Sequence, residues 1–409
     1  MPNTQFSPGE IKSFGVKANG VDISSMVLQA DIYMELFSPT WSSQISFVDT
    51  QNLLMNIPIK PGTQLELTLE TDYPENKKKT FRFVVYKISD RVQLGQENQG
   101  YILNCVTKEF FINQKKRVSK AYQSMSPQDM VNAILTDYSI GTLADFHSDS
   151  NKYTVIVPNM SPFAAVNWIT KFTMGQAADF WFYQSEDGEF KFQSYEKMLQ
   201  NRSGVVFKQL NPNKMDDSGN VPLENFLNIE HYEFLTQHDS MNNYAAGYYG
   251  NTVVSHDLYN KSFSTRTYAY GDDIAADKNY APFDEARFAG SQNSNITFNP
   301  MNTGLFGNNI QAPSDTSEDW TGSRKSNVMK MEENRLVMTV PGAVSHYELL
   351  GKQVNVELPS HQDVDEEEYL DKYMKCSYVV TAIRHTVTST FYKVMLELGK
   401  KRLENSING

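Results

Sequence analysis

Gly351-Lys-Gln-Val-Asn-Val-Glu-Leu358, Tyr378-Val-Val-Thr-Ala-Ile383 and Tyr392-Lys-Val-Met-Leu-Glu-Leu398 are the segments on which the interpretation of the whole chain depends. The first and third alternate apolar and polar residues, and the second is rich in β-branched and aromatic residues. Alternation with a period of two is typical of strands with one buried face. These segments therefore predict three consecutive antiparallel strands.

The same three patterns occur in the same order earlier in the sequence, as Gly62-Thr-Gln-Leu-Glu-Leu-Thr-Leu69, Phe83-Val-Val-Tyr-Lys-Ile88 and Tyr101-Ile-Leu-Asn-Cys-Val106. Both copies begin with Gly-x-Gln-apolar-x-apolar, and aromatic-Val-Val-x-x-Ile recurs without a gap. Alternating patterns are common, so a chance resemblance of two three-strand units is the alternative. We favour a duplicated antiparallel β unit, because a repeat determines the whole architecture where one is present.

The composition is that of an ordinary folded protein. The chain has 409 residues, of which 21% are charged and 40% hydrophobic, and this length predicts about two to four domains. The formal net charge of -11 argues against a protein that grips nucleic acid by neutralising phosphates, which needs a basic surface. Cys105 and Cys376 are expected to be small buried side chains in a reducing compartment. No signal peptide or membrane-length apolar run is recognised, so we expect a protein made in a cytoplasm.

Residues 1–116 are predicted to form a first β domain. Strand patterns cover five segments: 26–37, 44–48, 64–69, 80–88 and 101–106. About five antiparallel strands in this length indicate a small barrel or sandwich. The lysine-rich loop 72–79 is interpreted as a polar hairpin tip with solvated lysines, and contact with an acidic neighbour is the alternative.

Residues 117–198 are predicted to form a compact α/β domain between the two β units. Ser126-Pro-Gln-Asp129 and Ser161-Pro-Phe163 each place an N-cap serine before a proline at the first helical position. A strand is expected at 153–157, between the two helices, and a hairpin is expected at 179–193.

The chain then returns to β patterns, interrupted by a polar insert. Strands are predicted at 204–207 and 226–234, and again at 335–340 after a short helix near 326–334. Residues 241–320 are crowded with Asn, Gly, Ser and Tyr. This composition suits a surface excursion that contacts other chains and, equally, an ordinary irregular insert.

The search for catalytic chemistry gives a negative expectation. The sequence lacks the His and Cys spacings of zinc sites and the common phosphate-binding and nucleophile motifs. His231 and His238 could act as a base with Asp239, but a lone histidine beside an aspartate is far more often structural. The acidic run 363–368 lacks the glycine and spacing of a calcium loop, so a solvated hairpin tip is expected there. We predict no catalytic, cofactor-binding or metal-binding residue.

Five motifs together carry a family resemblance: Phe47-Val-Asp-Thr-Gln-Asn-Leu-Leu54, Glu109-Phe-Phe-Ile-Asn-Gln-Lys-Lys-Arg-Val-Ser119, Val157-Pro-Asn-Met-Ser-Pro-Phe163 with Asn167-Trp168, Val340-Pro-Gly342, and the closing segment from Val379 to Leu398. They span nearly the whole chain in order. Together they resemble the central baseplate hub subunit of contractile-tailed, T-even-type bacteriophages. Residues 241–320 depart most from the family.

The resemblance implies a mainly β fold with an inserted α/β domain, α+β overall, and two tail-tube-like antiparallel β-barrels in one chain. The implied division is a first barrel at 1–116, an α/β domain at 117–198, the first part of a second barrel at 199–240, a polar insert at 241–320, the closing part of the second barrel at 321–402, and a tail at 403–409.

The resemblance also implies a structural role without enzymatic activity. Three chains would form a ring of six similar units, which adapts a six-fold tail tube to a three-fold cell-puncturing spike. The implied partners are two further copies of the chain, the spike protein, the tail tube or tube-initiator protein, the tape-measure protein and the baseplate wedge proteins. DNA would pass through without specific binding, no membrane is involved, and the protein would reside in the virion after assembly in the host cytoplasm. The alternatives are an equivalent hub of a phage-derived injection system (a tailocin or a secretion spike) and a tail-associated cell-wall hydrolase.

The net charge indicates how such a channel would remain passable. A basic wall would bind phosphates, whereas an acidic or neutral wall leaves a duplex free to slide. Glu66, Glu357 and Glu397 are therefore expected in the lumen or on solvated faces rather than in ion pairs buried in the core. The alternative is that the charge only keeps an abundant assembly protein soluble.

Overall fold

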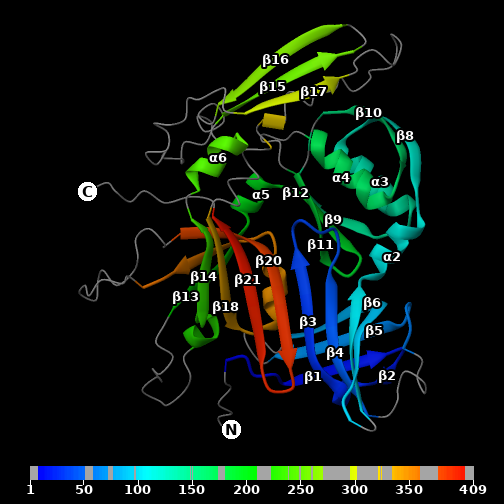
Figure 1. Ribbon diagram of the computed structural model, residues 1–409, viewed down its shortest axis with the longest axis vertical. Coiled ribbons are helices and arrows are strands. Elements are labelled where there is room, and N and C mark those ends of the chain that lie inside the picture. The colour runs from blue at the N-terminus through cyan, green and yellow to red at the C-terminus, as the bar shows by residue number, and fades with distance from the viewer. Residues whose placement is uncertain are drawn as a thin grey trace.

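The computed structural model describes residues 8–50, 59–71, 77–95, 98–147, 149, 151–173, 180–209, 223–237, 239–247, 250–258, 261–269, 295–301, 321–322, 324, 334–359 and 376–400. A large sheet occupies the lower half of Figure 1, a mixed α/β region lies above it, and a small separate sheet lies at the top.

The large sheet contains thirteen strands from both ends of the sequence. The earlier strands are β1 (Ser13–Ala18), β2 (Val21–Asp22), β3 (Val27–Glu35), β4 (Ser42–Asp49), β5 (Gln64–Thr71), β6 (Lys77–Gln93) and β7 (Gln99–Val106), with the 3-10 helix η1 (Ser24–Met26). The later strands are β13 (Arg202–Lys208), β14 (His231–Gln237), β18 (Asn334–Pro341), β19 (Gln353–Glu357), β20 (Cys376–Thr388) and β21 (Tyr392–Lys400), with η2 (Leu223–Leu227) and η4 (Val344–Leu349). The strand order is β14-β18-β21-β20-β3-β4-β7-β6-β5-β1-β2, and β19 pairs with both β13 and β20.

The mainly β character expected from the sequence is confirmed, but the described strands do not form two separate closed barrels. Both β units belong to one open sheet, because β20 pairs with β19 through its first residues and with β3 through its later ones. One hydrophobic core accordingly includes side chains from both units, among them Trp41, Phe81, Tyr378 and Tyr392.

The mixed region follows the first β unit in sequence. Its elements are α2 (Lys108–Lys115), β8 (Val118–Met125), α3 (Pro127–Asp137), β9 (Thr142–Phe146), β10 (Tyr153–Met160), α4 (Pro162–Phe172), β11 (Phe180–Glu186), β12 (Glu189–Ser194) and α5 (Tyr195–Gln200). β10 pairs with β8, while β12 pairs with β11 and, in parallel, with β9. Residues 118–192 contribute a second buried hydrophobic cluster. Both predicted helices are confirmed, and the side chain of Ser126 accepts a hydrogen bond from the backbone N–H of Asp129 at 3.4 Å.

The described part of the insert is a folded element rather than an irregular segment. After α6 (Ser240–Ala246), β15 (Gly250–Asp257) pairs antiparallel with β16 (Ser262–Ala269) and parallel with β17 (Ile296–Met301). The predicted helix near 326–334 lies outside the described residues, apart from Asn334, which begins β18. The acidic run 363–368 and the tail 403–409 are also outside them.

One predicted strand is only partly correct. Residues 226–234 contain the end of η2 and then a turn, in which the Asn228 N–H donates to the carbonyl of Asn225 at 3.3 Å, and β14 begins at His231. Within the described residues, no helix is long and apolar enough to span a membrane.

Candidate functional site

The predicted duplication is present in the sheet as two three-strand units with the same pairing. In the first, Gln64 lies opposite Val84 on β6; in the second, Gln353 lies opposite Val379 on β20. These are the matching positions of the two sequence repeats. Each unit begins at a glycine whose N–H donates across the pair: Gly62 to the carbonyl of Val85 at 2.8 Å, and Gly351 to that of Val380 at 3.0 Å.

The two units also share a β-bulge. Val85 pairs with Cys105, and the pairing resumes at Lys87 with Tyr86 left out. Val380 pairs with Leu398, and the pairing resumes at Ala382 with Thr381 left out. A bulge places one extra residue on one strand and changes its direction and twist. A bulge shared at matching positions supports duplication over chance resemblance, although β6 has a second irregularity, between Ser89 and Val92, that β20 lacks.

The equivalence extends to four strands in each unit. The first four-strand set is β3, β4, β7 and β6, and the second is β14, β18, β21 and β20, in that order along the sheet. Together they form an eight-strand segment, whose strands run side by side across Figure 1.

The two sets meet where β20 pairs with β3, and this internal junction contains a buried acid. Asp31 on β3 is only 6% exposed. The Arg384 Nε donates to Asp31 at 3.0 Å, and the Thr386 hydroxyl donates to it at 2.7 Å. The hydrogen bond to Asp31 raises the pKa of Arg384. Gln29, on the same strand as Asp31, donates to the other carboxylate oxygen at 2.7 Å. A buried carboxylate that accepts two hydrogen bonds from β20 favours one register of the junction, because a shift of the strands would break both.

One face of the eight-strand segment packs on the core, and the opposite face, here called the polar face, carries balanced charge. Its paired positions hold four cations and four acids: Lys87, Arg335, Arg384 and Lys393, and Asp31, Glu35, Glu233 and Glu397. Several of these charges are neutralised locally, since Arg335 lies 2.6 Å from Glu397 and Lys393 lies 2.7 Å from Glu230. Counted at the positions where the eight strands pair with one another, the polar face is therefore formally neutral; the part of β6 that pairs with β5 adds Lys78 and Arg82.

The three glutamates expected on solvated or luminal surfaces require a partial correction. Glu66 is half exposed and pairs with Arg82, as expected of a surface residue. Glu397 lies on the polar face but pairs with Arg335 and is only 25% exposed. Glu357 is 16% exposed and pairs with Lys208, its direct cross-strand neighbour, at 3.3 Å. Basic residues on neighbouring strands therefore pair with Glu397 and Glu357 and reduce their exposure.

The lysines predicted to be solvated instead contact acids, as the alternative interpretation stated. Lys77 and Lys79 lie at the start of β6 rather than in a loop. Lys77 lies 3.2 Å from Glu348, and Lys79 lies 3.4 Å from Glu186 and over the ring of Tyr347 at 4.6 Å. These contacts connect β6 to η4 and to the β11–β12 turn.

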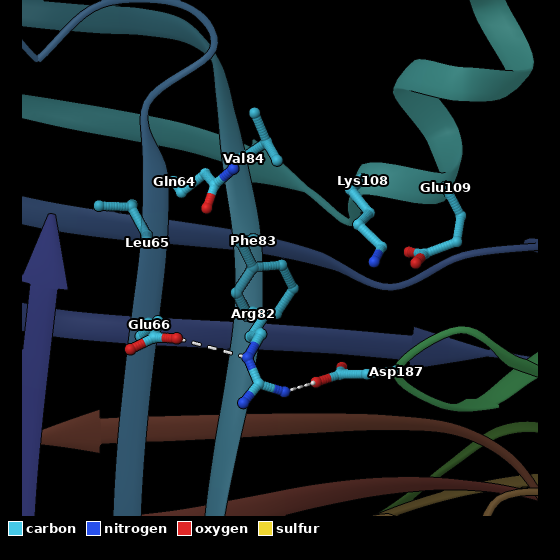
Figure 2. A pocket seen from close by; sticks show the side chains of 9 residues that line it. All are labelled: Gln64, Leu65, Glu66, Arg82, Phe83, Val84, Lys108, Glu109 and Asp187. Carbon is cyan, nitrogen blue, oxygen red and sulfur yellow. Dashed lines mark hydrogen bonds and ion pairs between the residues drawn. The ribbon is translucent and has the colours of Figure 1, made fainter. Parts of the chain in front are cut away.

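A pocket of 320 Å³ lies between β5, β6, the start of α2 and the β11–β12 turn (Figure 2). Arg82 lies between two acids of the lining, with its Nε 3.4 Å from Glu66 and an Nη atom 3.2 Å from Asp187. Burial raises the pKa of Asp187. The side chains of Lys108 and Glu109 lie together on the opposite wall. The lining thus holds three acids and two cations, and Arg82 pairs with two of the acids.

The structure does not assemble the candidate base and acid. His231 is exposed at the beginning of β14, whereas Asp239 follows the end of that strand, and His238 lies outside the described residues. A strand of this length separates its ends by roughly 20 Å. The Asp239 carboxylate instead caps α6 by accepting the Asn242 N–H at 3.1 Å. Among the described residues, no group of three or more His, Cys, Asp or Glu side chains could hold a metal ion.

The most strongly shifted histidines were not singled out by the sequence. His346 in η4 and His385 in β20 are 3% and 0% exposed. Burial lowers the pKa of His346 to about 4 and that of His385 to about 3, and the proximity of His346 contributes to the latter. His385 Nδ1 lies 2.7 Å from the Tyr392 hydroxyl, which donates to the carbonyl of Ala343 at 3.1 Å. The signal in the sequence is that His385 occupies a core position of β20, between Ile383 and Val387.

Cys105 is buried, as expected, and burial raises the pKa of its thiol. Cys376 is the first residue of β20, and its side chain is outside the described part of the structure. The described thiol is therefore a core group without the exposure that a reactive cysteine needs.

Comparison with known proteins identifies the fold. The structure is similar to the 43 kDa tail protein of prophage MuSo2 from Shewanella oneidensis, with a TM-score of 0.58 and 9% identity over 95% of this chain and 98% of that one. It is also similar to a tail protein from Neisseria meningitidis MC58, with a TM-score of 0.57 and 11% identity over 96% and 97%. No protein-family model and no curated protein matches the sequence. The chain thus has the fold of phage tail proteins, and the resemblance found in its sequence is confirmed at the level of the fold.

Proposed function

We propose that this protein is a structural baseplate hub protein of a contractile phage tail, and that three copies form a ring around a central channel. The observation that supports this most directly is the repeated pairing, in which two four-strand sets of one chain share register and bulge. Three such chains carry six similar sets. The six sets of such a ring can bind a six-fold partner, and its three chains can bind a three-fold partner.

The proposal gives the eight-strand segment a specific task. Three copies of eight strands form the wall of the channel, with the hydrophobic core outside and the polar face inside. Each tail-tube-like barrel is then completed between chains rather than within one, which agrees with the open sheet of the single chain. The six-part division of the sequence, from 1–116 to 403–409, belongs to this proposal.

The proposed partners follow from the symmetry. A six-fold tail tube or tube-initiator ring binds one side of the hub, the three-fold spike protein binds the other, and baseplate wedges surround it. The tape-measure protein and DNA pass through the channel. The protein acts in the virion, after assembly in the host cytoplasm, and it catalyses no reaction.

The experiment is a measurement of size and shape on the purified chain, alone and with its spike protein. Light scattering is expected to give three times the mass of one chain, and electron-microscopy class averages are expected to show a ring with a central hole and six similar lobes. A strict monomer in both preparations would contradict the proposal. A cell-wall turbidity assay tests the second part: digestion that is lost on replacing His231 and Asp239 by alanine would replace the structural role with a hydrolase.

A further inference from the structure

Two strand edges in the four-strand sets lack a partner within the described residues. β14 is at the end of the sheet and pairs with β18 only. β6 pairs with β7 along much of its length, but with β5 only through residues 77–84, so residues 87–93 have one free edge. A free edge presents unpaired N–H and C=O groups to a further strand.

The corresponding edge of the second set is occupied. β20 is the counterpart of β6, and its residues 382–388 pair with β3. β3 in turn is the counterpart of β14, since each begins its own four-strand set. The internal junction of β20 with β3 is therefore a template for a contact between β6 of one copy and β14 of another.

The register of this contact follows from the shared pairing. Val106 and Gly399 are counterparts, because they lie opposite Val84 and Val379. Gly100 on β7 and Lys393 on β21, each six residues earlier, are therefore also counterparts. Gly100 lies opposite Val92 on β6, and Lys393 lies opposite Thr386 on β20. Val92 thus takes the place of Thr386.

The residues of β14 have counterparts on β3 in the same way. Asp31 lies opposite Gln44, and Glu233 lies opposite Val337, and these two partners are themselves at matching positions on β4 and β18. Glu233 thus takes the place of Asp31. Because Thr386 lies opposite Asp31 at the internal junction, the equivalence places Val92 opposite Glu233.

Burial distinguishes the internal junction from the two free edges. Asp31 is 6% exposed, whereas its counterpart Glu233 is exposed. Val387 is fully buried, whereas Gln93 at the matching position is exposed, and Val92 is 55% exposed. Positions that are buried at the internal junction are therefore exposed to solvent at the free edges of β6 and β14.

The acid of the internal junction has a counterpart at the free edges, but its cation does not. At the internal junction the cation Arg384 is on β20 and the acid Asp31 is on β3. At the free edges the acid Glu233 is on β14, whereas the residue of β6 that matches Arg384 is Ser89.

We infer that residues 87–93 of β6 in one copy pair antiparallel with β14 of the next copy, with Val92 opposite Glu233 and Gln93 opposite Tyr232. This inference rests on the proposed ring and specifies how the ring closes. The two edges differ, so the contact is head-to-tail, and it repeats around the ring until it closes. The contact between chains keeps the register of the internal junction at Val92 and Gln93, and differs from it by the irregularity of β6 between Ser89 and Val92.

Cysteine cross-linking tests both the partners and the register. In the variant Val92→Cys with Glu233→Cys, the two side chains belong to directly opposite residues of neighbouring chains, whose Cβ atoms in an antiparallel pair lie roughly 5 Å apart. Mild oxidation of the purified full-length protein is expected to give disulfide-linked dimers and trimers. The matched control is Val92→Cys with Leu235→Cys, which moves one thiol two residues along β14 and is expected to link far less. The unaltered protein, with Cys105 and Cys376, gives the background.

Mixing single-cysteine chains tests the head-to-tail direction. Chains with Val92→Cys alone and chains with Glu233→Cys alone are each expected to remain unlinked, and their mixture is expected to give dimers. Linked dimers from Val92→Cys chains alone would mean that two β6 edges meet, which would overturn the inference.

The ring and the strand register can be contradicted separately. If light scattering gives a trimer but the in-register pair links no better than the off-register pair, the strand register is wrong and the proposed ring stands. If no preparation forms a trimer, the proposed function and this inference both fail.

Discussion

At the scale of single residues, the buried histidines are the groups through which pH acts on the fold. His346 and His385 are almost completely buried, and neither His346 Nδ1 nor His385 Nε2 has a hydrogen-bond partner among the described residues. Among the described residues no acidic group raises either pKa, and desolvation keeps both rings neutral.

This predicts a loss of stability on mild acidification. Both histidines have a pKa near 6.5 in the unfolded chain, and their pKa values in the folded chain are about 4 and about 3. Above pH 6.5 both states are neutral and no penalty exists; below it the unfolded state binds protons that the folded state does not. The free energy of unfolding should fall by roughly 2 kcal/mol per histidine between pH 6.5 and 5.

The measurement is urea unfolding at several pH values between 7 and 4.5. The control is the variant His346→Gln with His385→Gln, whose replaced side chains do not titrate, and the pH dependence should be correspondingly shallower. Equal pH dependence in the two proteins would show that other groups are responsible.

At the scale of elements, the two glycines that open the repeated units differ in their surroundings. Gly62 and Gly351 both have positive φ, at +98° and +70°. A Cβ atom at Gly62 would meet nothing within 4 Å, whereas one at Gly351 would lie 2.3 Å from the hydroxyl of Tyr183. The first turn therefore requires glycine for its backbone conformation alone, and the second also requires it for contact with β11.

Alanine at these positions should separate the two requirements. We expect Gly62→Ala to lower the free energy of unfolding by about 1 kcal/mol, from backbone strain, and Gly351→Ala to lower it by roughly 3 kcal/mol or more. Tyr183→Phe should be less than additive with Gly351→Ala, because it removes the nearest clashing atom, and additive with Gly62→Ala. Equal losses for the two glycines, measured by chemical denaturation, would contradict the stated role of Tyr183.

The elements predicted well from sequence are those with local signals. Period-two alternation located β5, β7, β19 and β21, and the Ser-Pro pairs located the starts of α3 and α4. The cap of α4 was not predictable, because Ser161 makes no side-chain cap and the Asn113 side chain accepts the Phe163 N–H instead, at 2.8 Å. That contact joins residues fifty positions apart, and no local pattern encodes it.

Long-range pairing also explains what the sequence did not show about the site. The repeat predicted two β units, but their fusion depends on β20 reaching β3, more than three hundred residues away in the sequence. The strands of the insert were hidden because β16, Ser-Phe-Ser-Thr-Arg-Thr-Tyr-Ala, carries few apolar residues in its alternation. His231 and Asp239 are close in sequence, but the extended strand between them keeps them far apart in space.

At the scale of the whole molecule, the net charge and the charge of the proposed channel are separate quantities. The chain carries -11 in total, yet the paired positions of the polar face are formally neutral. The excess of acid therefore lies outside these paired positions. A neutral wall with locally paired charges neither binds phosphates strongly nor repels a protein that passes through.

The last prediction tests whether this neutrality matters for passage of DNA. Gln44 is exposed on the polar face, and Gln44→Lys would place three new cations around the channel of a trimer, where one duplex can contact all of them. Val21→Lys, at a 44% exposed position on β2, adds the same charge outside the eight-strand segment. In fluorescence anisotropy with a short DNA duplex at low salt, the unaltered trimer and the Val21 variant should bind weakly, and the Gln44 variant should bind more tightly and lose that gain as salt rises. Tight binding by the unaltered trimer, or equal binding by the two variants, would show that the polar face is not the surface that DNA meets.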